Sequence, residues 1–164
     1  MTEILLKTLI DEDHATKILQ AKVPDLQVVS LRLKYHPFAG FIFDVPTLAG
    51  RLGTTHALVD YYTGKAFISG KWAKETNKAV SGDAVVSDPG WNSITFEVAR
   101  QKAKSLLLTA SLRSLRLAWK GGIRETAHVE KVWKPNWILQ VCIQGREYRV
   151  MVDGLNGGYF FIDA

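Results

Sequence analysis

The chain carries one short pattern of sequence twice. Residues 58–68 are Leu-Val-Asp-Tyr-Tyr-Thr-Gly-Lys-Ala-Phe-Ile, and residues 151–161 are Met-Val-Asp-Gly-Leu-Asn-Gly-Gly-Tyr-Phe-Phe. In each copy an apolar run ends in Val-Asp, a short turn ends in Thr-Gly or Asn-Gly, and aromatic residues follow. The pattern is typical of a β-hairpin. Its recurrence favours an internal duplication over two unrelated hairpins that happen to share turn residues.

The similarity continues upstream of both hairpins. Tyr35-His36-Pro37 precedes an apolar run at 41–45, and Trp133-Lys134-Pro135 precedes another at 137–143. The connection between the middle strands is longer in the first copy. The excess falls in the Gly-containing segment 46–55, where a surface loop would tolerate extra residues.

A helix is expected before each set of strands. Asp11, Glu12 and Asp13 are typical of a helix start, and apolar residues follow at helical spacing up to Pro24. The stretch 93–119 has neither Gly nor Pro, and its leucines recur near helical spacing.

The sequence therefore predicts an α+β protein of two tandem repeats, each a helix followed by a three- to four-stranded antiparallel meander. The first repeat is expected over residues 1–73, a polar connector over 74–92 and the second repeat over 93–164. Units of this size are marginally stable alone, so the two repeats could share one core. A sheet edge left open could pair with a second chain, which makes a homodimer feasible.

One helix, several antiparallel strands and a Val-Asp-x-x-Thr-Gly hairpin resemble PepSY-type domains and, more loosely, the cystatin-like class. The resemblance is carried by eight turn residues: Val59, Asp60, Thr63, Gly64, Val152, Asp153, Asn156 and Gly157. It implies a binding or inhibitory module with no catalytic residues to carry over. PepSY-like domains often stand beside secreted or membrane-bound peptidases, and this chain departs from that setting because its first residues do not form an export signal.

Composition is typical of a folded globular protein. The 164 residues are 47% hydrophobic and 23% charged, which argues against disorder. The single cysteine, Cys142, excludes an intramolecular disulfide and is expected to be a small buried residue in a strand. No segment is apolar enough to cross a membrane. Together these features predict a cytoplasmic protein that does not contact membranes.

No residue pattern predicts a catalytic site, a metal or a cofactor. The histidines show no i, i+4 pair, and neither a nucleophile elbow nor a phosphate-binding loop occurs. Asp60 and Asp153 could be paired acids, but an Asp that opens a turn accepts hydrogen bonds from amides two residues on, so a turn role is favoured. An enzyme or small-ligand binder with a pocket in a cystatin-like cone stays an alternative, because such pockets use scattered residues.

Adjacent aromatic residues favour a binding surface. Tyr61-Tyr62 and Phe160-Phe161 are neighbours in sequence, and strand neighbours alternate, so one member of each pair is expected to point outward or to be covered by the other half or by another chain. Tyr61, Tyr62 and Trp72 are therefore the candidate partner-binding residues. The function expected from them is a non-catalytic binding or regulatory module that recognises a protein or peptide through a sheet face or edge.

A basic helix offers a second alternative, the binding of single-stranded nucleic acid. The net charge is +5 and the sequence pI is about 9.4. Basic side chains beside an aromatic platform suit this ligand because bases stack while phosphates follow the positive charge. The candidate residues are Arg113, Arg116, Trp119, Lys120 and Arg124. The same residues also fit an ordinary solvated helix face.

Overall fold

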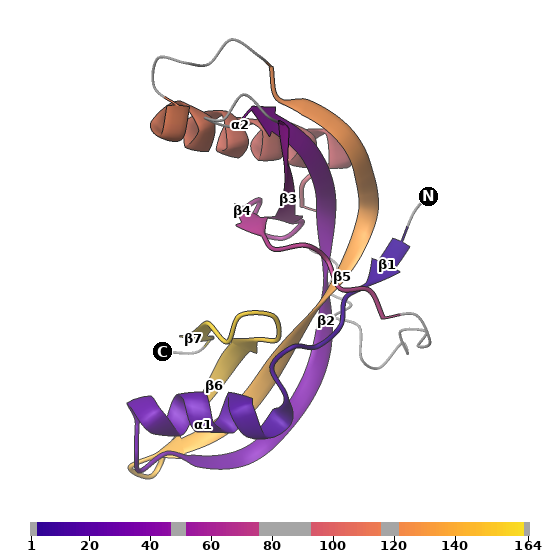
Figure 1. Cartoon of the computed structure of the whole chain (residues 1–164). Coiled ribbons are helices and arrows are strands. Elements are labelled where there is room, and N and C mark those ends of the chain that lie inside the picture. Colours follow the sequence, from indigo (N-terminus) through magenta and orange to yellow (C-terminus); the bar gives the residue numbers. More distant parts are fainter. Residues whose placement is uncertain (1–2, 47–51, 76–92, 116–121, 163–164) are drawn as a thin grey trace. The chain divides into compact units, whose positions relative to one another are not determined.

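The computed structural model describes residues 3–46, 52–75, 93–115 and 122–162, with the backbone alone described at 46, 52 and 111–115 (Figure 1). These ranges contain two helices, α1 (Glu12–Lys22) and α2 (Phe96–Leu115). The strands are β1 (Glu3–Leu5), β2 (Gln27–Pro46), β3 (Leu52–Asp60), β4 (Ala66–Ser69), β5 (Arg124–Ile143), β6 (Arg146–Asp153) and β7 (Tyr159–Phe161). Neither helix combines the length and the apolar character that a bilayer-spanning segment requires.

The strands of the described residues form one seven-stranded sheet. Its order is β4-β3-β2-β5-β6-β7, and β1 pairs with β5 outside that path. The successive strands β2-β3-β4 and β5-β6-β7 are antiparallel neighbours. β4 and β7 therefore form the two ends of the sheet.

The chain divides into two compact units, named here by their helices. The α2 unit contains α2, β3, β4, β2 from Pro37 onward and β5 up to Val132. The α1 unit contains α1, β6, β7, β2 up to His36 and β5 from Trp133 onward. Each of the two long strands, β2 and β5, thus contributes residues to both units.

The core of the α2 unit lies between α2 and one face of its strands. Ala99, Ala103 and Leu107 recur every four residues and form a buried stripe on the helix. This stripe packs in one cluster with side chains of β2 and β3, among them Phe41, Phe43, Ala57 and Val59. Phe96 at the helix start stacks on Phe41 with ring centroids 5.2 Å apart.

The core of the α1 unit is built in the same way. Asp11 caps α1 by accepting a hydrogen bond from the backbone N–H of His14 at 2.7 Å, which confirms the predicted helix start. Ala15 and Leu19 are buried and pack with alternate residues of β5 and β6: Leu139, Val141, Val150 and Val152.

The prediction of two tandem helix-plus-meander repeats is wrong. The strands share one sheet, and each helix packs mainly on the hairpin that follows the other helix. α1 packs on β5 and β6, which follow α2 in the chain. α2 packs on β3 and β4, which follow α1.

The length of β2 and β5 explains the difference. Each has 20 residues, whereas a typical strand has about five or six. Proline lacks the N–H that a ladder needs, so Pro37 and Pro135 are unusual in the interior of a strand. Both prolines nevertheless lie buried inside continuous strands. Each long strand therefore belongs partly to the unit of the helix that precedes it and partly to the unit that contains its hairpin.

The two predicted turns are confirmed and share one local geometry. Asp60 Oδ1 accepts a hydrogen bond from the N–H of Tyr62 at 2.8 Å, and Asp153 Oδ1 accepts one from Leu155 at 2.8 Å. Gly64 and Gly157 close the turns with φ of 70° and 77°, a backbone region that favours glycine.

Candidate functional site

The end strand β7 turns half of its backbone groups away from the sheet. Two backbone hydrogen bonds mark the ends of its ladder with β6. Asp153 N donates to Gly158 O at 2.7 Å, and Ile162 N donates to Arg149 O at 2.8 Å. Hydrogen-bonded and non-bonded pairs alternate in an antiparallel ladder. Phe160 therefore lies in a hydrogen-bonded pair with Met151, whereas Tyr159 and Phe161 point their N–H and C=O groups away from β6.

Apolar side chains are exposed on both faces of this strand. Phe160 is 55% exposed, and Tyr159 and Ile162 are each 38% exposed. Tyr159 pairs in register with Val152 and so shares the face that carries α1, while Phe160 lies on the opposite face. A strand whose side chains are exposed on both faces is typical of a sheet edge that lacks its next neighbour.

The opposite face extends this apolar surface inward from the edge. Ile138, Met151 and Phe160 lie in one row across β5, β6 and β7, because each pairs in register with the next. Ile138 and Met151 are half-buried. We call Ile138, Met151, Tyr159, Phe160 and Ile162 the β7 edge surface.

The other end strand, β4, is covered to a greater degree by its own unit. α2 lies against β4 on one face. On the other face the ring of Phe67 packs edge-on against Phe38 at 5.9 Å between centroids. Ile68 is exposed, but the strand is flanked by Lys65 and Lys71, and charged residues beside an edge disfavour pairing with another chain.

Trp72 lies against the same face of the α2 unit. A Cβ added to Gly40 would come within 2.6 Å of the indole, so the ring occupies the space that a side chain would fill. The indole Nε1 donates to Ser69 Oγ at 2.9 Å, and the ring packs edge-on against His56. The half-buried Trp72, a predicted partner-binding residue, is thus engaged in intramolecular packing.

The two predicted tyrosines differ in exposure. Tyr61 is 5% exposed and belongs to the core of the α2 unit, where its hydroxyl donates to the carbonyl of Glu130. Burial raises the pKa of Tyr61 to about 12, with Glu130 adding to the shift. Tyr62 is half-buried, and both tyrosines lie in the turn after β3 rather than on a strand. Tyr61 is therefore the inward-facing member of the pair, and a partner would not reach its buried side chain.

The basic candidates are only partly described. Arg116, Trp119 and Lys120, together with the side chain of Arg113, lie outside the described residues. Arg124 is exposed at the start of β5, where its guanidinium lies 3.5 Å from Asp44. The binding of single-stranded nucleic acid by these residues therefore stays a prediction from the sequence.

A buried polar cluster, which the sequence did not predict, lies in the α1 unit. Lys134 and Asn136 are each 4% exposed. Lys134 Nζ donates to Asp153 Oδ2 and to Asn136 Oδ1, both at 2.7 Å, and Asn136 Nδ2 lies 2.9 Å from His36 Nδ1. The lysine is paired with a carboxylate, as a buried charge requires, and this arrangement ties β5 to the turn after β6.

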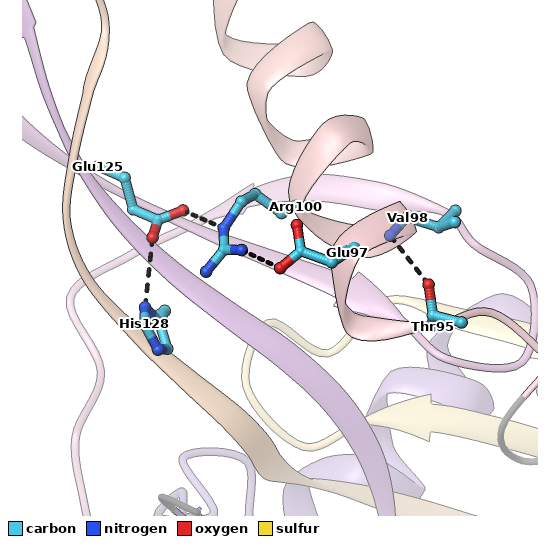
Figure 2. Close-up of polar contacts among 6 residues, drawn as sticks. All are labelled: Thr95, Glu97, Val98, Arg100, Glu125 and His128. Carbon is cyan, nitrogen blue, oxygen red and sulfur yellow. Dashed lines mark hydrogen bonds and ion pairs between the residues drawn. The ribbon is translucent and has the colours of Figure 1, made fainter.

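A second polar cluster ties α2 to β5 in the α2 unit. Figure 2 shows Arg100 between Glu97 and Glu125, with His128 near the other carboxylate oxygen of Glu125 at 3.2 Å. Arg100 Nε donates to Glu125 at 2.9 Å, and these hydrogen bonds raise the pKa of the guanidinium further. Because the Arg100 guanidinium donates to a carboxylate of α2 and to a carboxylate of β5, the cluster fits a structural role for the helix start.

Among the described residues, no group of three or more His, Cys, Asp or Glu side chains is arranged to hold a metal ion. Comparison with protein-family models, with curated proteins and with solved structures finds no significant match to this chain. The resemblance to PepSY-type and cystatin-like domains therefore stays a prediction from the sequence.

Of the β7 edge surface, only Phe160 was indicated by the sequence, through the adjacent pair Phe160-Phe161, and the other four residues were not. A signal for them exists in the run Tyr159-Phe160-Phe161-Ile162, which is uncharged. The corresponding segment around β4 has Lys65 before it and Lys71 after it. The β4 run 66–69 is uncharged as well, so the two segments differ in what flanks them, because residues 159–162 lie between Gly158 and Asp163 with no lysine beside them. A run of four large apolar residues without a neighbouring lysine is typical of an edge that accepts another strand.

Proposed function

We propose that this protein is a binding module that holds a polypeptide partner by adding one of its strands beside β7. The observation that carries the proposal is the outward direction of the backbone groups of Tyr159 and Phe161 in an uncharged end strand. In β-strand addition such main-chain groups supply affinity, and alternate side chains supply specificity.

The exposed side chains supply the second contribution. An added strand would cover Tyr159 on one face and Phe160 with Ile162 on the other, which removes apolar surface from water. Large aromatic residues at the centre of an interface commonly carry much of the binding energy. Phe160 is the most exposed of the three and is expected to contribute most.

A capture experiment with matched variants tests the proposal. The wild type, Phe160→Glu and Ile68→Glu are immobilised, exposed to lysate from the source cells, and bound proteins are identified by mass spectrometry. Phe160→Glu places a charge on the β7 edge, and Ile68→Glu places the same charge at a residue of similar exposure on the β4 edge. Circular dichroism and thermal unfolding confirm that both variants fold.

The expected result is a protein, whether a different chain or this chain itself, that wild type and Ile68→Glu retain and Phe160→Glu loses. Reconstitution with the purified partner should then slow amide exchange at Tyr159 and Phe161. Equal capture by all three proteins would overturn the proposal. Loss with Ile68→Glu alone would place the interface on the other edge of the sheet and would equally contradict it.

A further inference from the structure

We infer that the partner which the β7 edge surface fits is a second copy of this chain, joined antiparallel, β7 to β7, about a two-fold axis at Phe160. The inference rests on the proposed function, because both require strand addition at this edge. It adds the identity of the partner and a single register.

The register follows from the direction of the backbone groups. Tyr159 and Phe161 are two residues apart and both point their N–H and C=O groups away from β6. In an antiparallel pair of identical strands, Tyr159 of each copy can exchange both hydrogen bonds with Phe161 of the other. The two sets of bonds are equivalent, as an isologous interface requires.

This register places Phe160 opposite its own equivalent. The position lies between the two hydrogen-bonded pairs and is therefore a non-bonded pair, in which the Cα atoms approach to about 4.5 Å and side chains are closest. The exposed phenyl ring would then meet the same ring of the second copy. The apolar row of Ile138, Met151 and Phe160 would continue into its counterpart across the axis.

Charge favours this strand as the place where two copies meet. Each chain carries a net charge of +5, so two copies repel each other at a distance. β7 and Ile162 contain no charged residue, so the pairing sets no like charges directly opposite each other. Salt screens the general repulsion, and the dimer should therefore become tighter as salt concentration rises.

Disulfide trapping tests the register. In a Cys142→Ala background, which removes the native thiol, Phe160→Cys should form a disulfide-linked dimer under mild oxidation, because non-bonded antiparallel pairs have suitable Cα separation. Tyr159→Cys should link poorly, since its two copies do not face each other. Ile68→Cys, at a similarly exposed position on β4, is the control for random collision.

Sedimentation of the protein without engineered cysteines gives an independent result. The wild type should show a concentration-dependent dimer, and Phe160→Glu should weaken it about tenfold or more, because it sets two like charges opposite each other. Phe160→Thr, which keeps a strand-forming residue, should weaken it less and guards against a fold defect in the charged variant.

A wild type that stays monomeric at all concentrations would overturn the inference. Equal linking of Phe160→Cys and Ile68→Cys would do the same, as would a dimer that Tyr159→Cys traps better than Phe160→Cys. These outcomes are separable from failure of the proposed function. If the wild type is monomeric but captures a different protein that Phe160→Glu loses, strand addition at β7 holds and only the pairing of two copies is wrong.

Discussion

Lys134 Nζ lies 2.7 Å from Asp153 Oδ2, in an ion pair whose lysine side chain is 5% exposed. Asp153 also holds the turn after β6 through the N–H of Leu155. Asp60 makes the same turn bond in the other hairpin. The two aspartates therefore differ in role. Both accept the turn hydrogen bond, but among the described contacts only Asp153 also pairs with a buried lysine.

The two aspartates should respond differently to loss of charge. Asparagine retains the oxygen that accepts the turn bond, so Asp60→Asn should change the free energy of unfolding by less than about 1 kcal/mol. Asp153→Asn leaves the Lys134 ammonium buried without its carboxylate and should cost about 3 kcal/mol, the low end for a broken buried pair because the aspartate side chain is 21% exposed. Urea denaturation of both variants measures the difference, and equal losses would contradict it.

Gly157 should be less tolerant of alanine than Gly145. Both have positive φ, 77° and 79°, so a Cβ is strained at either position. A Cβ at Gly157 would also lie 2.8 Å from Ile18 Cδ1, whereas nothing lies within 4 Å at Gly145. We expect Gly145→Ala to cost about 1 kcal/mol and Gly157→Ala measurably more. Thermal unfolding of the two variants provides the test, and a larger loss at Gly145 would refute the packing described for α1.

The contact of Gly40 with Trp72 predicts a compensating pair of substitutions. Gly40→Ala should destabilise the protein by about 1 to 3 kcal/mol, because the new methyl group meets the indole and Val132. Trp72→Leu removes the ring but leaves Val132 Cγ2 2.7 Å from the new methyl group, so in that background Gly40→Ala should cost less but should still destabilise the protein. A double-mutant cycle by chemical denaturation measures the coupling. Additive effects would show that Trp72 does not pack over Gly40, and would leave it available to a partner.

The burial of Tyr61 leads us to expect a loss of stability at high pH. Its pKa is about 12 in the folded protein and 10.0 in the unfolded chain, so between these values the unfolded state releases the proton first. The free energy of unfolding should therefore fall as pH rises from 10 to 12. Tyr61→Phe lacks this proton and should show a smaller fall over the same range. Parallel pH profiles of the two proteins would contradict the burial of Tyr61.

The local elements could be predicted from the sequence, whereas their assembly could not. Asp11 marks the start of α1, and the Val-Asp turns form where the pattern places them, because caps and turns depend on neighbouring residues. The continuity of β2 through Pro37 depends on its neighbours in the sheet, which no local pattern specifies. The assignment of each helix to the other hairpin is likewise a tertiary choice.

The sequence predicted one residue of the β7 edge surface and not the surface as a whole, again because local patterns do not specify the order of strands in the sheet. Strand alternation requires one member of Phe160-Phe161 to point away from the core, and Phe160 is the exposed one. The choice of Tyr61, Tyr62 and Trp72 instead rested on the first hairpin. There α2 and the packing of Trp72 cover much of the sheet, and the order of the strands that decides this is not contained in the hairpin sequence.

Amide hydrogen exchange along β7 tests strand addition most directly. The amides of Phe160 and Ile162 point toward β6 and should be protected at every protein concentration, while those of Tyr159 and Phe161 should be protected only when a second strand is bound. We predict that protection of Tyr159 and Phe161 appears on partner binding or self-association and disappears in Phe160→Glu. If both amides exchange rapidly under conditions where the protein is demonstrably bound to its partner, β7 does not receive a strand.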